Sequence, residues 1–149
     1  MPISFLVRRK AGCEDLPLPR YMSEAAAGMD VCAAVEAPAV IAPGDVKLIP
    51  TGLYVAVPVG YEVQVRPRSG LALKHGLTIV NAPGTIDADY RGEVGIIVGN
   101  IGREPFTITR GMRVAQLILA AVTRADVKVV DELPETRRGE GGFGHSGTH

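Results

Sequence analysis

The sequence has little aromatic character and no tryptophan. Aromatic residues make up 5% of its 149 residues, whereas hydrophobic residues as a group make up 46%. A chain of this length is expected to form one domain around one core, and this share of apolar residues excludes a disordered chain. Because aromatic side chains are scarce, aliphatic Val, Ile, Leu and Ala must fill that core.

The sequence also lacks net charge and has only two cysteines. Lys and Arg number 16, as do Asp and Glu, so the formal net charge at pH 7 is zero. A broad electrostatic footprint for nucleic acid is therefore not expected, and any phosphate must be bound by a few placed groups. Cys13 and Cys32 form no CxxC pair, no signal-peptide pattern opens the chain, and no apolar run is long enough to cross a bilayer. We expect a cytoplasmic protein in a reducing compartment, with no nucleic-acid or membrane partner.

Short apolar runs bounded by turn residues dominate the chain. Residues 61–66 alternate apolar and polar side chains, which is typical of a half-buried strand. No long amphipathic helical segment is present. Strands that recur with turn signals about every eight to twelve residues predict an all-β sandwich or barrel. The expected strands are residues 3–9, 25–34, 46–49, 52–57, 61–66, 77–80, 93–98, 104–109, 112–122 and 126–131.

Residues 81–92 are the stretch around which the rest of the chain is organised. Pro83 and Gly84 signal a turn between two apolar runs, which predicts a β-hairpin with a polar, acidic tip. Backbone N–H and C=O groups at such a tip are free to read the edge of a flat polar ligand, such as a nucleobase. Asp87 and Tyr90 would stand beside that ligand. The alternative is an ordinary hairpin with a solvated Asp and a packed Tyr.

A second candidate site follows the strand at 61–66. Pro67 ends the strand, and residues 71–75 are expected to form one helical turn closed by Gly76. Arg68, Ser69 and the Gly70 amide would then form an anion site at the start of that turn. The alternative is a surface turn with a solvated Arg.

Two polar residues interrupt otherwise apolar strands. Gln116 lies inside the apolar run 112–122, so its amide must bond either the backbone or a ligand. Asp30 enters an apolar run after Gly28. It stands either near a phosphate or metal site, or bonds local backbone N–H groups.

The last residues, 137–149, are rich in Gly and polar groups and cannot build a core. Residues 139–144 match GxGxxG, but the dinucleotide fingerprint needs a strand before it and a helix after it. No Walker A sequence, metal-spaced His or Cys pair, or nucleophile elbow is present. The segment is either a disordered tail or a mobile arm. In the second case its backbone would wrap phosphates, Arg138 would add charge and Phe143 would stack on a base.

Five stretches, in order along the chain, resemble the five motifs of the trimeric dUTP pyrophosphatases (dUTPases). They are residues 27–33, 67–76, 81–93, 110–118 and 138–147. The resemblance implies a distorted jelly-roll-like fold of short antiparallel strands, spanning 1–135, and a flexible arm, 136–149, that closes an active site. It also implies a homotrimer with sites between subunits. The implied reaction is hydrolysis of dUTP to dUMP and pyrophosphate with Mg²⁺, which lowers dUTP and supplies dUMP for dTMP synthesis.

The resemblance also implies roles for the residues of the third motif. Asp87 resembles the general base that activates water for in-line attack on the α-phosphorus. Tyr90 resembles the ring packed beneath deoxyribose, which leaves no room for a 2′-hydroxyl. The residues that resemble the uracil reader are Asn81 and the backbone at Gly84, Thr85 and Ile86.

Further roles fall outside that motif. The residues that resemble phosphate binders of the neighbouring subunit are Arg68, Ser69, Gly70 and Gln116. The residues that resemble the γ-phosphate ligands and the uracil lid are Arg138, Phe143, Gly144 and Ser146. Asp30 is similar to the Asp of the first motif, which we expect to act through water or by positioning other groups. The metal is expected to be bound by the triphosphate, since no cluster of protein side chains that would bind it directly is visible in the sequence.

Two departures and two rival functions accompany this resemblance. His145 stands where many family members have the first hydroxyl of Ser-Thr-Gly, and Val31 replaces a common Leu.

The dCTP deaminase branch shares the fold but usually has a Glu in the hairpin region. The Asp87 found here and the complete Gly-rich arm favour a dUTPase. The other rival is a nucleotide-responsive binding protein, against which Asp87 argues.

Overall fold

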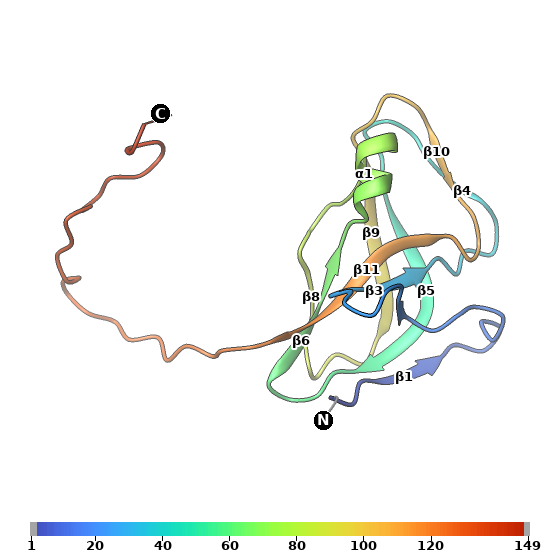
Figure 1. Ribbon diagram of the computed structural model, residues 1–149, viewed down its shortest axis with the longest axis horizontal. Coiled ribbons are helices and arrows are strands. Elements are labelled where there is room, and N and C mark those ends of the chain that lie inside the picture. Colours follow the sequence, from blue (N-terminus) through green and yellow to red (C-terminus); the bar gives the residue numbers. More distant parts are fainter. Residues whose placement is uncertain (1–2, 148–149) are drawn as a thin grey trace.

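The computed structural model describes residues 3–147, which are built almost entirely from short strands (Figure 1). In chain order the elements are β1 (Leu6–Arg9), β2 (Arg20–Tyr21), β3 (Met29–Cys32), β4 (Ala39–Ile41), β5 (Val46–Ala56), β6 (Tyr61–Arg66), α1 (Ser69–His75), β7 (Leu77–Ile79), β8 (Gly84–Ile86), β9 (Glu93–Asn100), β10 (Phe106–Ile108) and β11 (Arg113–Ala121). The predicted all-β fold is confirmed.

The strands form two larger sheets and one short pair. The first sheet has the order β1-β5-β9-β7, the second has the order β2-β3-β11-β6-β8, and β10 pairs with β4. These pairings are antiparallel, as predicted. Val63 of β6 and Ile96 of β9 are fully buried in one shared cluster, so the two sheets pack against each other. The core is aliphatic, because the chain has few aromatic residues with which to fill it.

β5 is one long strand with an irregularity in its middle. The prediction of separate strands at 46–49 and 52–57 is wrong, because β5 continues through Pro50 and shifts its register against β9 between Pro50 and Tyr54. Gly52 adopts a left-handed φ of 65° within this shift. The Thr51 hydroxyl is buried there and donates a 2.6 Å hydrogen bond to the Val94 carbonyl. The irregularity therefore binds β5 firmly to the start of β9.

The predicted hairpin around residues 81–92 is only partly correct. Its flanking strands do pair, since Ile79 of β7 lies opposite Val98 of β9. The connection between them is not a tight tip, however, because it contains β8, which pairs with β6 in the other sheet. Ile86 explains this crossing, since β8 buries its side chain in the core. The segment thus links the two sheets and leaves a space between β8 and β9.

α1 confirms the predicted helical turn and extends it by two residues at its start. Gly76 ends the helix with a φ of 68° and donates its N–H to the Ala72 carbonyl at 3.0 Å. Only glycine adopts this conformation at no steric cost. Arg68 immediately precedes the helix and so lies where β6 turns away from the sheet.

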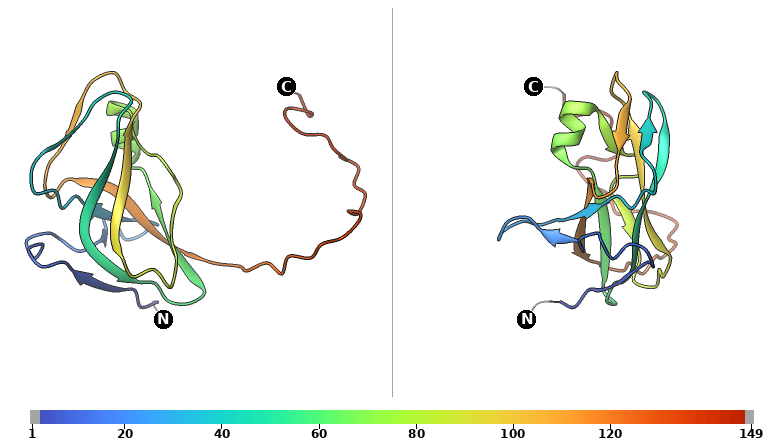
Figure 2. Two further views of the ribbon diagram at one scale, coloured as in Figure 1. Left: turned by 180° about the vertical axis from the view of Figure 1, so that it is seen from behind. Right: turned by 90° about the vertical axis from the view of Figure 1, so that its right-hand side faces the viewer.

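After Ala121 the chain leaves the two sheets. Residues 122–147 form neither strand nor helix, so the predicted strand at 126–131 is wrong. Val127 and Val129 are 88% and 97% exposed, so an apolar pattern is present without a strand to pair with it. Figures 1 and 2 show this segment running away from the rest of the molecule. The proposed boundary at residue 135 stays a prediction. Within residues 3–147, no helix has the length and apolar character needed to cross a membrane.

Candidate functional site

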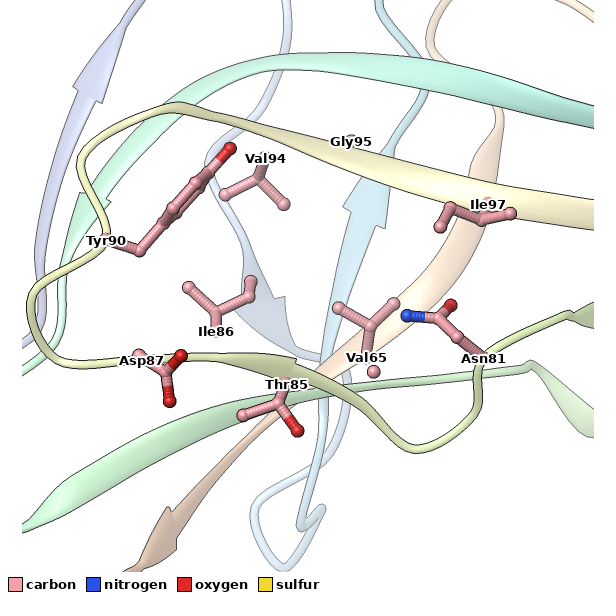
Figure 3. A pocket seen from close by; sticks show the side chains of 10 residues that line it. Val65, Asn81, Thr85, Ile86, Asp87, Tyr90, Val94, Gly95 and Ile97 are labelled. Carbon is pink, nitrogen blue, oxygen red and sulfur yellow. The ribbon is translucent and has the colours of Figure 1, made fainter.

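A pocket of about 150 Å³ lies between β8 and the beginning of β9 (Figure 3). Six of the residues predicted to bind the nucleoside or to act on it line this pocket, namely Asn81, Gly84, Thr85, Ile86, Asp87 and Tyr90. Four others were not singled out from the sequence, namely Val65, Val94, Gly95 and Ile97. All four lie within stretches predicted as strands, and that prediction gave no reason to place them beside a ligand.

The pocket is apolar in the middle and polar at its ends. Val65, Ile86 and Val94 lie between the two strands, Asn81 lies at one end, and Asp87 and Tyr90 lie at the other (Figure 3). Ligand pockets commonly combine apolar walls with a few placed polar groups that fix orientation. This arrangement suits a flat ligand with a polar edge and a polar extension.

The polar edge of the pocket comes from the backbone of β8 and from Asn81. β8 is the last strand of its sheet, so one side of its backbone is not used by β6. Gly84 allows a close approach here, since an added Cβ would lie 3.0 Å from Nδ2 of Asn81 and 3.2 Å from Cβ of Val65. The Asn81 amide, which carries both a donor and an acceptor, therefore packs directly against the backbone of β8.

Asp87 and Tyr90 occupy the two ends of one turn. The backbone N–H of Tyr90 donates to the Asp87 carbonyl at 3.1 Å, which holds the carboxylate and the ring on the same short loop. The Asp87 side chain is exposed at the mouth of the pocket, and no basic residue within 3–147 forms an ion pair with it. The carboxylate therefore faces solvent at the mouth of the pocket and is not neutralised by an ion pair with the described residues.

Arg68 and Gln116 lie in a different pocket, together with Asp30 and Arg113. One oxygen of Asp30, Oδ2, lies 2.9 Å from Nη1 of Arg113 and 3.4 Å from Nε of Arg68. Arg68 also donates from Nη1 to the Arg113 carbonyl at 3.0 Å. Among the described residues the partners of Asp30 are guanidinium groups on distant segments, so the alternative in which it bonds local backbone N–H groups is wrong. Together the three side chains carry one net positive charge, which suits an anion.

Gln116 bonds the backbone and also lines this second pocket. Its Nε2 donates to the Pro67 carbonyl at 2.9 Å, while Oε1 packs against Gly28, where an added Cβ would lie 2.5 Å from it. Gln116 thus bonds the backbone while it lines the pocket, and its role toward a ligand stays a prediction. Ser69 and Gly70 are exposed next to this pocket, at the start of α1.

The arm residues lie apart from both pockets. Arg138 donates from Nε to the Gly141 carbonyl at 2.6 Å, and Phe143 is fully exposed. Gly144 and Ser146 belong to the same exposed stretch, which Figures 1 and 2 show away from the sheets. One chain therefore brings together the predicted nucleoside residues, but keeps the predicted phosphate and arm residues separate from them.

Charged groups of the fourth motif also hold the loop before β2. Arg110 donates to both carboxylate oxygens of Asp15, at 2.9 and 2.7 Å, and to the Gly12 carbonyl at 2.7 Å. The hydrogen bonds from Arg110 lower the pKa of Asp15, and those to Asp15 raise the pKa of Arg110. Cys32 lies in a hollow that Asp30 and Arg113 also line, and burial raises the pKa of its thiol, which favours the neutral form.

No group of three or more His, Cys, Asp or Glu side chains that could hold a metal ion occurs among residues 3–147. The Asp30 carboxylate already has two cationic partners, and Asp87 stands alone at the mouth of its pocket. These residues fit a metal that arrives with phosphate oxygens, since Mg²⁺ is usually bound by one or two carboxylates together with substrate phosphates and water.

Known proteins similar to this chain point to one family. A family model described as dUTPase matches residues 14–147. A Deoxyuridine 5′-triphosphate nucleotidohydrolase from Desulfotalea psychrophila is 60% identical over 97% of each chain. Another protein of that name, from Caldanaerobacter subterraneus subsp. tengcongensis, is 52% identical over 99% of each chain.

A solved structure extends this agreement to the fold. The dUTPase of Staphylococcus bacteriophage 80alpha, described with dUPNHPP, aligns with a TM-score of 0.86 over 97% of this chain and 99% of that one, at 26% identity. This likeness agrees with the predicted jelly-roll-like arrangement of strands. Since the family model spans all five motifs and both curated relatives cover at least 97% of the sequence, the chain belongs to the dUTPase family.

Proposed function

We propose that this protein hydrolyses dUTP to dUMP and pyrophosphate by attack of a water on the α-phosphorus, with Asp87 as the general base. The observation that carries the proposal is the pocket between β8 and β9. It combines the Asn81 amide, an unused backbone edge, the Tyr90 ring and a free carboxylate within one short segment. This combination can hold a flat base, a sugar and an activated water side by side.

Uracil is read by the edge of β8 and by Asn81. Uracil and cytosine differ in donor and acceptor at adjacent positions, so a rigid edge that pairs with one base leaves polar groups unpaired with the other. Sites built on such hydrogen bonds reject the wrong partner by several orders of magnitude at best. Gly84 packs closely against Asn81 and Val65, so this edge would leave little space for the methyl group of thymine. The Tyr90 ring packs against deoxyribose and excludes a 2′-hydroxyl.

The chemical step moves one proton and breaks one bond. The Asp87 carboxylate accepts a proton from water as the water oxygen bonds the α-phosphorus, and the bond from that phosphorus to the oxygen bridging to the β-phosphorus breaks. The pyrophosphate leaves on the side opposite the water, as in-line displacement requires. Mg²⁺ bound to the triphosphate would offset the charge of the phosphates and of the leaving pyrophosphate. Arg68 and Gln116 hold the phosphate chain, and Asp30 would act on the metal through water or by positioning Arg68 and Arg113.

The active site is proposed to be assembled between subunits of a homotrimer. Within one chain, Arg68 lines one pocket and Asp87 another, and the segment carrying Arg138 leaves the sheets altogether. An exposed apolar side chain on the outward face of the first sheet supports association of subunits. Leu48 is 68% exposed on this face and packs over Gly95. Residues 136–149 are proposed to act as an arm over a neighbouring site, with Arg138 and Ser146 on the γ-phosphate and Phe143 on uracil.

The protein is further proposed to act in the cytoplasm, where it would lower dUTP and supply dUMP for dTMP synthesis. Cys13 and Cys32 support a reducing compartment, since both are buried free thiols.

A product assay on four nucleotides tests the proposed activity. Purified protein with Mg²⁺ is given dUTP, dCTP, dTTP or UTP, and pyrophosphate and ammonia are followed separately. We expect pyrophosphate from dUTP far faster than from the other three, and no ammonia. Ammonia from dCTP would identify a deaminase, and the absence of any product would identify a binding protein. Sedimentation of the same sample measures the subunit number, for which a trimer is expected.

A further inference from the structure

Gly92 leaves the space in which the Tyr90 ring lies. A Cβ on Gly92 would be 2.6 Å from Cζ of Tyr90, 3.0 Å from Cε2, and closer still to the phenolic oxygen. Carbon atoms do not approach so closely, so the ring occupies a volume that any other side chain at this position would fill. The backbone supplies no second reason for glycine, because Gly92 is not among the glycines with a positive φ.

A hydrogen bond holds the ring in that space. The Tyr90 hydroxyl donates to the backbone carbonyl of Glu93 at 2.9 Å, so the side chain folds back over the loop that joins β8 to β9. Glu93 is itself anchored, because its carboxylate accepts the Gly52 N–H at 3.0 Å and the Lys10 ammonium at 3.0 Å. The ring is thereby tied to the rigid junction of β5 and β9 rather than to its loop alone.

The surroundings of Tyr90 determine what a larger residue at position 92 would do. The Tyr90 side chain is 44% exposed, so solvent lies on one side of the ring and the side chain can swing outward. A methyl group at position 92 would meet the far end of this movable side chain and not a fixed backbone. The expected consequence is a displaced ring at little cost in stability.

We propose that Gly92 is a positioning residue that sets sugar specificity. By leaving room for the folded-back ring, Gly92 fixes Tyr90 against the C2′ side of the sugar, where a ribose hydroxyl would collide with it. The inference rests on the proposed function, because it requires that the sugar of the bound nucleotide packs on Tyr90. Gly92 has no contact with the nucleotide in this proposal and acts only through the ring.

The test is Gly92→Ala, with kcat/KM measured for dUTP and UTP, and equilibrium binding measured for dUMP and UMP. A displacement of about 1 Å in a positioning group can change rates by about a hundredfold, so we expect the ratio of UTP to dUTP activity to rise at least about tenfold. The ratio of UMP to dUMP affinity should rise in the same direction. The midpoint of thermal unfolding should change little. Asp89→Ala, an exposed substitution in the same loop, is the control and should leave both ratios unchanged.

Two further variants separate an effect through the ring from a general disturbance of the loop. Tyr90→Ala alone should lose sugar discrimination, and adding Gly92→Ala to it should cause no further change, since no ring remains to be displaced. A folded Gly92→Ala protein with the parent ratios, or an additive effect in the double variant, would overturn the proposal. If Gly92→Ala alone fails to fold, recovery of the fold by Tyr90→Ala supports the contact and continued failure refutes it. A parent protein without preference for dUTP would refute the proposed function instead.

Discussion

Asp30 and Arg113 form an ion pair between β3 and β11, with Oδ2 of the carboxylate 2.9 Å from Nη1 of the guanidinium. The same oxygen lies 3.4 Å from Nε of Arg68, and Arg68 also donates to the Arg113 carbonyl. The carboxylate of Asp30 therefore pairs with two guanidinium groups, those of Arg113 and Arg68, and neutralises only one of their two positive charges. Without Arg113, Asp30 would face the guanidinium of Arg68 alone and would cancel the charge intended for a phosphate.

Arg113→Ala is expected to weaken binding of a triphosphate far more than binding of a monophosphate. Charge-assisted hydrogen bonds to phosphate are stronger than neutral ones, so loss of one net positive charge should weaken binding of a non-hydrolysable dUTP analogue by about tenfold or more. Titration calorimetry with that analogue and with dUMP measures the difference. Arg103→Ala removes an exposed charge away from Asp30 and is the control. Equal weakening of both ligands would contradict this role for Arg113.

Asp87→Asn is expected to abolish most of the turnover while leaving binding intact. Asparagine keeps the shape of the side chain but cannot accept the proton, and loss of a general base typically costs about a hundredfold or more in kcat. Steady-state kinetics measure kcat, and affinity for the non-hydrolysable analogue should be nearly unchanged. Asp89→Asn, an exposed carboxylate in the same loop, provides the matched control. A variant with near-normal kcat would remove Asp87 from the mechanism.

Local patterns predicted the features that depend on neighbouring residues. The alternation at 61–66 indicated β6, and Gly76 indicated the end of α1, because both signals act within a few residues. Asn81, Asp87 and Tyr90 could be grouped for the same reason, since they share one short segment. The structure places all three residues along one pocket, and the roles that the family resemblance gives them stay predictions.

The features that the sequence could not predict depend on distant partners. β8 pairs with β6 and thereby buries Ile86 in the core. The residues within 81–92 do not indicate with which strand this segment pairs. Asp30 and Arg113 are 83 positions apart, so neither reveals the other. The apolar pattern at 126–131 looked like a strand, but a strand also needs a partner, and one chain provides none there.

The pair of Arg110 and Asp15 should make stability depend on acid pH. Because Arg110 lowers the pKa of Asp15, the folded protein favours the ionised carboxylate. The stabilisation is therefore present above the unfolded pKa of an Asp, about 3.9, and is lost as the pH falls through the lower folded value. Asp15→Asn should reduce the midpoint of thermal unfolding near neutral pH, and the difference from the parent should shrink below about pH 4. Glu36→Gln, at an exposed site, should show no such convergence. A pH-independent difference would exclude this linkage.

Residues 122–147 follow β11 and cover neither the pocket with Asp87 nor the pocket with Arg68 in their own chain. Val127 and Val129, within this segment, are exposed. A segment of this kind reaches a neighbour at low cost when the assembly holds that neighbour close, because the effective concentration is then high. Closure of the arm over a bound nucleotide would exclude water and add the charge of Arg138 and the face of Phe143. We therefore expect the arm to serve a site whose Asp87 belongs to another chain.

Complementation between two inactive variants tests that expectation. One variant is Asp87→Asn with an intact arm, and the other ends after Glu135 with Asp87 intact. The two are unfolded and refolded together, and mixed oligomers are separated by a charge tag on one parent. If the arm acts on a neighbour, some sites in the mixture combine an intact Asp87 with an intact arm, and pyrophosphate release from dUTP rises above that of either parent refolded alone. If the arm serves its own chain, every site lacks one of the two components, and verified mixed oligomers stay as inactive as their parents.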